Sequence, residues 1–239
     1  MTGAVIDEAA VAGRRAEDDT AETRLTIGAT QGCERLEQRV TRYATGRSRS
    51  RAAGDREHVL FVVSGAGRLD LDGHAHALAA NTGVYVAPGE RYEVDNDGPE
   101  ELVVVEVTVP GPADPGPAPG RQVTVRLDDQ PVHWAGERQF RLLVDTPVGC
   151  RGATQFVGEI PTGHAPPHSH SYDEVVYVIA GEGAVHMADI EEPIGPGSCV
   201  YLPPQLLHCL ENTGEATLRV LGVIQPAGDP GSKAAVSGR

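Results

Sequence analysis

The sequence contains an internal repeat. A shift of 116 positions, from residue 65 to residue 181, aligns the first half of the chain with the second half without a gap. A register kept by chance over such a span would be rare, so we interpret it as the duplication of one β-rich unit. The identical pairs include Val59 and Val175, Val62 and Val178, Gly65 and Gly181, Gly67 and Gly183, Val84 and Val200, Tyr85 and Tyr201, Pro88 and Pro204, Asn96 and Asn212, Gly98 and Gly214, Leu102 and Leu218, and Val104 and Val220.

The repeated unit has the composition of a β protein. Of its 239 residues the chain has 29 glycines and 18 prolines, and these interrupt short runs rich in β-branched residues. Such runs between turn-forming residues are typical of strands, so we expect an all-β protein. The predicted strands are 59–63, 69–73, 83–89, 102–109, 122–127, 139–144, 153–160, 174–179, 198–202 and 217–224.

Composition also suggests domain boundaries. Residues 1–24 are small, polar and charged without periodicity, so we expect a disordered N-terminal arm. Residues 111–120 contain only Gly, Pro, Ala and Asp, which predicts a semi-extended linker. The linker separates a first unit, 25–110, from a second, 121–227, and the small residues of 228–239 predict a disordered tail.

The second unit contains a cluster of potential metal ligands. His168 and His170 are one residue apart, so in an extended segment their side chains face the same side. Glu174 opens the next predicted strand, and His208 lies further along. Three imidazoles and a carboxylate suit a divalent transition metal and leave coordination positions open for water, O₂ or a chelating substrate. The alternative is a surface histidine cluster beside an ordinary strand glutamate.

Two motifs around these residues resemble those of the cupin superfamily. Each motif combines histidines with glycine, and the first also contains a glutamate. The first is matched by His168, His170, Glu174 and Gly181, with Gly163 one residue closer than the family spacing, and the second by Gly197, Pro203, His208 and Asn212, with Gln205 where glycine is usual.

The resemblance implies a bicupin, which has two tandem jelly-roll β-barrels in one chain. It also implies one divalent metal in the C-terminal barrel. We expect Fe²⁺ or Mn²⁺, with Ni²⁺, Cu²⁺ and Zn²⁺ as alternatives. The expected ligands are His168, His170, Glu174 and His208.

The first unit lacks this ligand set. The same shift places Ala52, Gly54, His58 and Tyr92 at the four ligand positions. One imidazole and one phenol are a poor set for a divalent ion. We therefore expect the N-terminal barrel to be metal-free.

Other histidines and a cysteine lie near the motifs without matching them. His74 and His76 repeat the two-residue spacing, but they map outside both motifs and read as turn residues facing solvent. Strand alternation turns Cys209 away from the face that His208 uses, so we expect a packed, inert thiol. His186 stays unassigned. Tyr172 and its neighbour Asp173 could orient the ligands through hydrogen bonds.

An apolar pocket beside the metal would suit a small organic molecule that chelates through oxygen. Val176 and Val178 share strand parity with Glu174, and Leu206 and Leu210 share it with His208, so these four are the expected pocket residues.

Resemblance to quercetinase-like bicupins suggests O₂-dependent oxidation, with Glu174 and His208 as the catalytic residues. A non-redox isomerase, decarboxylase or aminohydrolase is the first alternative, and a non-catalytic protein that binds a small molecule through its metal is the second.

Charge and hydropathy exclude other partners. A formal net charge of −14 argues against binding nucleic acid, which requires a basic surface. No apolar run reaches the roughly 20 residues of a membrane span. The four cysteines form no C-x-x-C pair and read as reduced thiols, so we expect a cytoplasmic protein. Family resemblance makes a homodimer plausible.

Overall fold

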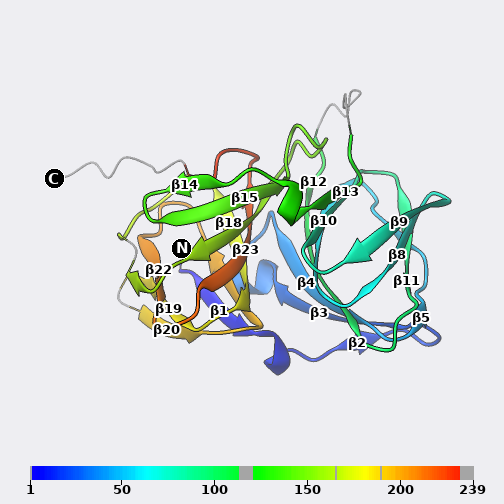
Figure 1. The fold of residues 1–239 in the computed structure, drawn as a ribbon, viewed down its shortest axis with the longest axis horizontal. Helices are drawn as coiled ribbons and strands as arrows, with labels where there is room; N and C mark the ends of the chain where they lie inside the picture. Colours follow the sequence, from blue (N-terminus) through cyan, green and yellow to red (C-terminus); the bar gives the residue numbers. More distant parts are fainter. Residues whose placement is uncertain (1, 113–120, 165, 189, 232–239) are drawn as a thin grey trace.

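The computed structural model describes residues 2–112, 121–164, 166–188 and 190–231. Within these ranges the chain forms two β-barrels side by side, as Figure 1 shows. The expected all-β class and the tandem jelly-roll architecture are thus confirmed. Residues 113–120 of the predicted linker and 232–239 of the predicted tail lie outside the described residues.

The first barrel is built from two sheets. The larger sheet has seven strands, in the order β13 (Thr124–Arg126), β10 (Thr82–Val86), β7 (Arg56–Ser64), β12 (Leu102–Pro110), β4 (Glu37–Tyr43), β3 (Ala21–Ile27) and β2 (Arg14–Arg15). The smaller sheet contains β5 (Gly46–Arg47), β11 (Arg91–Asn96), β8 (Ala66–Leu71) and β9 (His74–Ala79), and β6 (Arg51–Ala52) pairs with β11.

The second barrel repeats this plan. Its larger sheet runs β1 (Ala4–Asp7), β21 (Ser198–Leu202), β18 (Asp173–Ala180), β23 (Leu218–Gln225), β16 (Thr154–Ile160), β15 (Arg138–Val144) and β14 (His133–Ala135). Its smaller sheet runs β17 (Gly163–His164), β22 (His208–Asn212), β19 (Gly183–Met187) and β20 (Ile190–Ile194). Among the described residues the helical turns are short 3-10 segments, Glu8–Ala10, Ala29–Gln31 and Leu127–Asp129.

The 116-residue shift relates the strands of the two barrels. It carries β7 onto β18, β10 onto β21 and β12 onto β23. The repeat retains glycine where the backbone requires it: Gly65 and Gly181 have φ values of +84° and +87°. A β-carbon on Gly65 would lie 2.6 Å from the carbonyl oxygen of Glu101, and one on Gly181 would lie 2.8 Å from that of Thr217. Both turns therefore exclude side chains.

The first strand of each half belongs to the other barrel. β1 pairs antiparallel with β21 of the second barrel, and β13 pairs with β10 of the first. The prediction of a disordered arm over 1–24 is therefore wrong for its described residues, and residues 124–126 belong to the first barrel instead of the second. The physical reason is that the edge strands β21 and β10 offer free backbone groups, which almost any sequence can pair with.

Buried contacts fix the N-terminal segment in place. Val5 packs against the core of the second barrel, and Ile6 packs against the core between the two barrels. Glu8 is buried and forms an ion pair with Arg42 of β4. The hydroxyl of Tyr177 donates to the same carboxylate over 3.5 Å. This segment therefore links both barrels.

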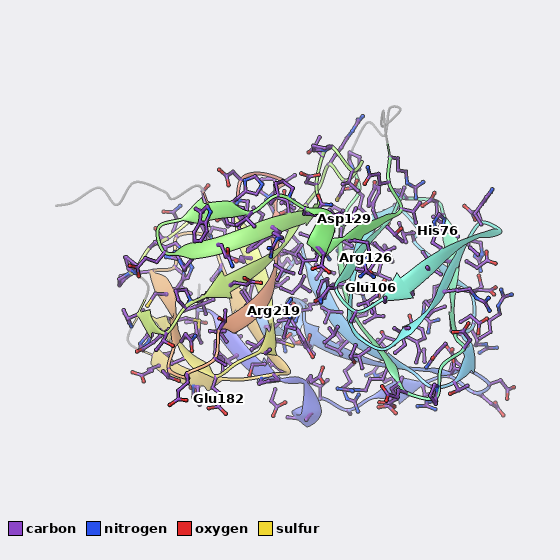
Figure 2. All side chains as sticks on the ribbon, viewed as in Figure 1. His76, Glu106, Arg126, Asp129, Glu182 and Arg219 are labelled. Atoms are coloured by element: carbon purple, nitrogen blue, oxygen red, sulfur yellow. The ribbon has the colours of Figure 1, made fainter. Side chains whose placement is uncertain are left out.

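The two larger sheets pack face to face and share one core. Phe61 and Val105 of the first barrel lie in the same buried cluster as Tyr177 and Leu221 of the second. Across the boundary Arg219 of β23, labelled in Figure 2, donates to the side-chain oxygen of Asn81 over 3.1 Å. Each barrel has a separate apolar interior as well.

The start of the predicted tail is held against the second barrel. The backbone N–H of Gly228 donates to the hydroxyl of Thr154 over 3.0 Å, and Tyr172 donates to the carbonyl of Pro230 over 3.3 Å. The prediction of disorder over 228–239 is therefore wrong for residues 228–231. The small-residue composition did not indicate order here, because the tail makes both contacts through its backbone, which any sequence carries.

Deletion of residues 2–13 should expose the edge of β21. We expect faster amide hydrogen exchange at Ser198–Leu202. The free energy of unfolding should fall by about 2 kcal/mol, since two half-buried aliphatic side chains are lost at roughly 1.5–3 kcal/mol for each full burial. The control is Arg15→Ala in the exposed strand β2. Unchanged exchange at β21 in the deletion variant would refute this placement.

Candidate metal centre

Two backbone hydrogen bonds bring the ligand segments together. The N–H of His168 donates to the carbonyl of His208 over 2.9 Å, and the N–H of His208 donates back over 2.9 Å. His168 precedes β18, whereas His208 begins β22 in the smaller sheet. The pair therefore joins the two motifs that the sequence separates by about forty residues.

All three imidazoles are oriented in the same way. In each ring Nδ1 lies within hydrogen-bonding distance of a backbone carbonyl, which can only accept. Nδ1 therefore carries the proton, and in the neutral ring Nε2 keeps a free lone pair. The three bonds are His168 to Pro166 at 3.3 Å, His170 to Tyr172 at 2.8 Å and His208 to Leu206 at 2.8 Å.

The structure brings the predicted ligands together. The ligand atoms of His170, Glu174 and His208 lie within 4.8 Å of one another. His168 lies beside this trio, with its ring centroid 4.5 Å from that of His208. Nε2 of His170 is buried 3.1 Å from a carboxylate oxygen of Glu174, yet it forms no hydrogen bond with any described residue. A buried nitrogen of this kind is expected where a cation binds.

Burial keeps two of the imidazoles neutral. Loss of solvent, together with the neighbouring His208, lowers the pKa of His168 to about 4. Burial likewise lowers the pKa of His208, although Glu174 opposes the shift. Neutral imidazole is the form that binds a metal. Together with the unpartnered nitrogen of His170, the donor set of His168, His170, Glu174 and His208 fits a divalent cation.

The turn before His208 departs from the family motif but keeps its geometry. Gln205 has a φ of +64°, whereas Gly89 at the equivalent position in the first barrel has +85°. A residue with a side chain pays roughly 1–2 kcal/mol for this left-handed conformation. The N–H of Gln205 donates to the carbonyl of His170 over 2.7 Å, so the strained turn holds a ligand segment.

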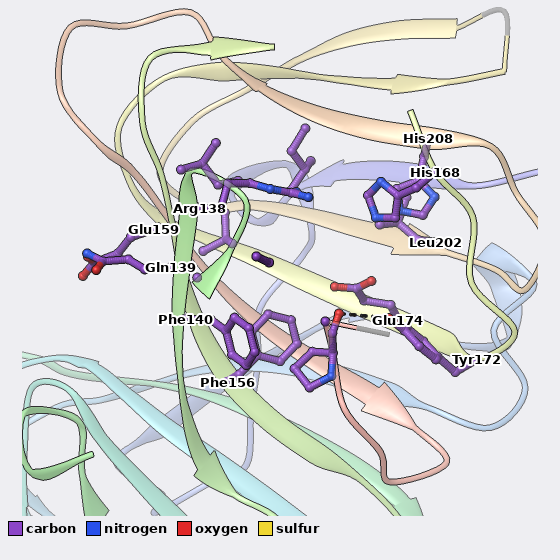
Figure 3. A pocket seen from close by; sticks show the side chains of 17 residues that line it. Arg138, Gln139, Phe140, Phe156, Glu159, His168, Tyr172, Glu174, Leu202 and His208 are labelled. Carbon is purple, nitrogen blue, oxygen red and sulfur yellow. Dashed lines mark hydrogen bonds between the residues drawn. The ribbon is translucent and has the colours of Figure 1, made fainter. Parts of the chain in front are cut away.

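A cavity of about 90 Å³ adjoins these residues, as Figure 3 shows. A water molecule needs roughly 10–15 Å³ of such space, so the cavity holds only a small molecule. One side carries His168, His208 and Glu174, and Arg138 lies across from them. The remaining wall is largely apolar and includes Phe140, Phe156, Leu202, Leu210 and Val220.

The predicted pocket residues are only partly correct. Leu210 lines the cavity, but Val176, Val178 and Leu206 do not. Val176 and Val178 are fully buried in the core of the second barrel, and Leu206 packs against that core. Strand parity correctly placed Val176 and Val178 on the interior face of the barrel. At their positions, however, the interior is filled by packed side chains, so no cavity is left beside them.

Sequence reasoning missed the opposite wall. Arg138 and Phe140 come from β15, Phe156 comes from β16, and Pro230 and Gly231 come from the tail. Period-two alternation along 138–144 places Arg138 and Phe140 on one face and so could have suggested them. The proximity of the tail depends on tertiary contacts, which no local pattern indicates.

The two residues between the motif ligands have different roles. The ring of Tyr172 stacks on that of His170, with centroids 4.0 Å apart and planes at 9°. The carbonyl of Tyr172 accepts the Nδ1–H of the same histidine. Tyr172 is thus a positioning residue. Asp173 instead accepts a hydrogen bond from the hydroxyl of Tyr201 over 2.7 Å, away from the centre.

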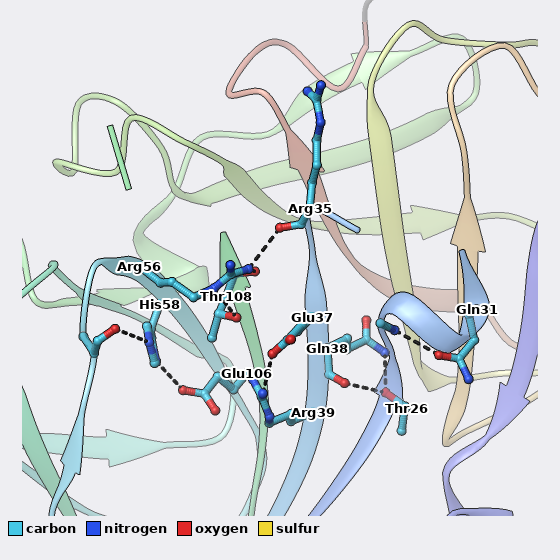
Figure 4. A network of polar contacts seen from close by, with 12 residues as sticks. Thr26, Gln31, Arg35, Glu37, Gln38, Arg39, Arg56, His58, Glu106 and Thr108 are labelled. Atoms are coloured by element: carbon cyan, nitrogen blue, oxygen red, sulfur yellow. Dashed lines mark hydrogen bonds and ion pairs between the residues drawn. The ribbon is translucent and has the colours of Figure 1, made fainter. Parts of the chain in front are cut away.

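In the first barrel the histidine at the position equivalent to Glu174 is engaged by other groups (Figure 4). Nδ1 of His58 lies 2.6 Å from a carboxylate oxygen of Glu106, and Nε2 lies 3.2 Å from the carbonyl of Ala53. The hydroxyl of Tyr92 donates to the same oxygen of Glu106 over 2.7 Å. Both ring nitrogens are therefore occupied, and the metal-free first barrel stays a prediction supported by this packing.

The other histidines and the cysteine that the sequence analysis considered lie elsewhere. His74 and His76 (Figure 2) are on strand β9 of the first barrel, so their expected place in a turn is wrong, and His74 at the start of that strand is exposed. Cys209 is buried and turned away from the centre, as predicted, and burial raises the pKa of its thiol. The sulfur lies 3.3 Å from Nε2 of His164.

Comparison with known proteins fits this geometry. The chain matches the cupin domain twice, over residues 39–108 and 156–224, which is more than half of its length. The chain is a member of the cupin family. Both matched segments fall within the two barrels, so the cupin repeat accounts for the duplication.

Among curated relatives, protein SchB of Streptomyces halstedii is 31% identical over 114 residues, covering 45% of this chain and 82% of SchB. Auxin-binding protein 1 of Arabidopsis thaliana is 34% identical over 73 residues, covering 27% of this chain and 37% of that protein. The second match thus spans little more than a third of the relative.

Solved structures share the two-barrel fold. A putative glyoxylate induced protein of Pseudomonas aeruginosa has a TM-score of 0.78 and 18% identity, covering 100% of this chain and 91% of its own. A single-site mutant of the Bacillus subtilis oxalate decarboxylase has a TM-score of 0.78 and 12% identity, and the match covers 97% of this chain and 79% of that one. At such identities the likeness shows the fold alone. Within the described part of the chain, no helix has the length and apolarity to cross a membrane.

Removal of Glu106 should destabilise the first barrel in a pH-dependent way. Burial alone would raise the pKa of Glu106, but hydrogen bonds and charge from His58 and the bond from Tyr92 lower it from 4.5 to about 2. The carboxylate therefore stabilises the fold above pH 4.5, and this stability is lost as the pH falls towards 2. Glu106→Gln should cost about 2 kcal/mol at pH 7.

The measurement is urea unfolding of both proteins at several pH values. The difference in unfolding free energy between wild type and Glu106→Gln should shrink as the pH falls below 4.5. A constant difference down to about pH 3 would show that Glu106 is not held ionised by its partners.

Loss of a motif histidine should remove one metal ion per chain. We expect His170→Ala and His208→Ala, after loading with Mn²⁺ and removal of excess ion, to contain one ion less than wild type by elemental analysis. The matched control is His74→Ala, which removes an exposed histidine with the same two-residue spacing. Equal metal content in all the folded variants would rule out this ligand set.

Proposed function

We propose that this chain is a metal-dependent cupin enzyme that acts on a small organic acid in its second barrel. The observation that carries the proposal is Arg138, which lines the same small cavity as His168, Glu174 and His208. Arg138 makes no hydrogen bond or ion pair with any residue that the structure describes. A guanidinium without a partner in a cavity is suited to a carboxylate, which it binds through two parallel hydrogen bonds.

Electrostatics support an anionic ligand. Burial lowers the pKa of Arg138, and the nearby Glu174 opposes this shift. A desolvated cation is costly unless it is paired, so a bound carboxylate would offset the cost. The cavity of about 90 Å³ limits that acid to a few non-hydrogen atoms.

The site residues would divide the work as follows. His168, His170, Glu174 and His208 would hold the divalent ion, which supplies Lewis acidity and, when it is iron or manganese, redox capacity. Arg138 binds the substrate carboxylate. A carboxylate oxygen of Glu174 can accept a proton from the substrate and return it. The aromatic wall excludes water and so strengthens these charged contacts.

The first reaction that we propose is oxidation by O₂. The apolar wall of Phe140, Phe156 and Leu210 gives a nonpolar gas a favourable environment, and it shields a reactive intermediate from water. The second candidate is non-redox chemistry, such as isomerisation, decarboxylation or aminohydrolysis. It is favoured by the presence of a carboxylate and a guanidinium in the same cavity, which can move a proton and stabilise an anion without an oxidant.

Substitution of Arg138 tests the substrate class. The wild-type protein, loaded with Fe²⁺ or Mn²⁺, is given small 2-oxo, 2-hydroxy and dicarboxylic acids and their neutral amides in an oxygen electrode, with product analysis. We expect turnover of an acid only, and a rise in KM of about 10–100-fold in Arg138→Ala, which corresponds to a charged hydrogen bond of about 1.5–3 kcal/mol.

Arg141→Ala is the matched control, because Arg141 lies on the same strand with opposite parity and is near Glu159 at 3.6 Å. O₂ consumption in step with product supports the oxidase chemistry, whereas equal turnover without O₂ supports the non-redox candidate. Tight binding of an acid without any turnover would instead indicate a non-catalytic protein that binds a small molecule through its metal. Equal turnover of acids and amides would overturn the role of Arg138.

The cysteines support a reducing compartment. All four, Cys33, Cys150, Cys199 and Cys209, are buried free thiols. Free thiols of this kind are typical of proteins that fold under reducing conditions. We therefore retain a cytoplasmic location as part of the proposal.

A further inference from the structure

A second group of potential ligands lies on the other face of β22. Side chains alternate along this strand, so His208 and Leu210 face the barrel interior while Cys209 and Glu211 face outward. Cys209 is directly opposite His186 of β19, and Glu211 is directly opposite His164 of β17. Three adjacent strands thus bring four ligand-type side chains to one outer face.

These side chains are in contact. Sγ of Cys209 lies 3.3 Å from Nε2 of His164. The rings of His164 and His186 have centroids 4.8 Å apart. One ligand atom from each of His164, His186 and Cys209 can be chosen so that all lie within 4.8 Å of one another.

Glu211 orients both imidazoles. One of its carboxylate oxygens lies 2.8 Å from Nε2 of His186 and 3.3 Å from Nδ1 of His164. A carboxylate accepts from both N–H groups, so in the neutral rings the opposite nitrogens keep their lone pairs. On His164 that free nitrogen is the one beside the sulfur. Carboxylates that hold ligand imidazoles in this way are common around metal ions.

We propose that His164, His186 and Cys209 form a second metal site that binds Zn²⁺, with Glu211 as a positioning residue. Two imidazoles and one thiolate are the ligands that Zn²⁺ prefers, and a tetrahedral ion would keep its fourth position for water. The buried sulfur lies below the two partly exposed histidines, so an ion can enter from solvent. The thiol proton passes to solvent on binding. The exposed Glu191, 3.7 Å from Nδ1 of His186, is a neighbouring carboxylate on the same face.

This site is separate from the centre in the barrel. The two groups lie on opposite faces of β22, and of the ligand groups found among the described residues only the outer one contains a thiol. A spectroscopic signal from a thiolate therefore reports this site alone. Failure of the proposed enzyme activity would leave such a signal unchanged.

Co²⁺ substitution tests the proposal on the full chain. Thiolate ligation of Co²⁺ gives a charge-transfer absorption in the near ultraviolet, which nitrogen and oxygen ligands do not give. In the variant that carries His168→Ala and His170→Ala, and so lacks the barrel centre, we expect this absorption to saturate at one ion per chain and to be displaced by Zn²⁺. It should disappear in Cys209→Ser and in His164→Ala. Glu211→Gln should weaken Co²⁺ binding by about 10–100-fold.

Two controls separate this site from other causes. Cys199→Ser removes a different buried thiol and should keep the absorption, and His168→Ala with His170→Ala removes the barrel centre and should keep it too. Because His164 is exposed, its variant tests the site even if Cys209→Ser fails to fold. Absence of the absorption in folded wild type with excess Co²⁺, or its persistence in folded His164→Ala and Cys209→Ser, would overturn the proposal.

Discussion

The candidate centre depends on the backbone pairing between His168 and His208. Two hydrogen bonds of 2.9 Å hold the segment before β18 against the start of β22. The turn at Gln205 adds a third bond, to the carbonyl of His170. With the backbone fixed, each imidazole is oriented by a carbonyl two residues away. The ligand geometry is thus set by the main chain before any ion binds, which lowers the entropic cost of binding.

The two barrels share one backbone fold but differ in how the polar groups at equivalent positions are hydrogen-bonded. In the first barrel His58 and Tyr92 both bond to the buried Glu106, so a polar cluster is satisfied internally. In the second barrel His170 keeps a buried nitrogen without a hydrogen bond, and Arg138 has no paired acid among the described residues. A fully bonded cluster contributes to stability, whereas unpaired polar groups around a cavity indicate a site for a ligand.

Local sequence patterns predicted much of the fold and of the centre. The repeat and the turn glycines predicted two copies of a β-rich unit, because alternation and tight turns are local properties, and the resemblance to cupins implied that each copy is a barrel. The motif spacing identified His170, Glu174 and His208, which the structure brings together. The pairing of β1 with β21 and the contact of Pro230 with Tyr172 could not be predicted in this way. Alternation can place Arg138 and Phe140 on one face of their strand, but it does not show that this face meets the centre. These features depend on which strand edges and sheet faces meet after folding. Backbone groups make many of the hydrogen bonds involved, and these do not depend on the side chains.

The second barrel, and not the first, should hold a divalent ion on the duplicated frame. Anomalous scattering from crystals grown with Mn²⁺ is the decisive measurement, because it locates the ion among the side chains. We expect a strong peak surrounded by His168, His170, Glu174 and His208, and no peak beside His58. A peak beside His58, or no peak between the four motif residues at full Mn²⁺ loading, would contradict this assignment.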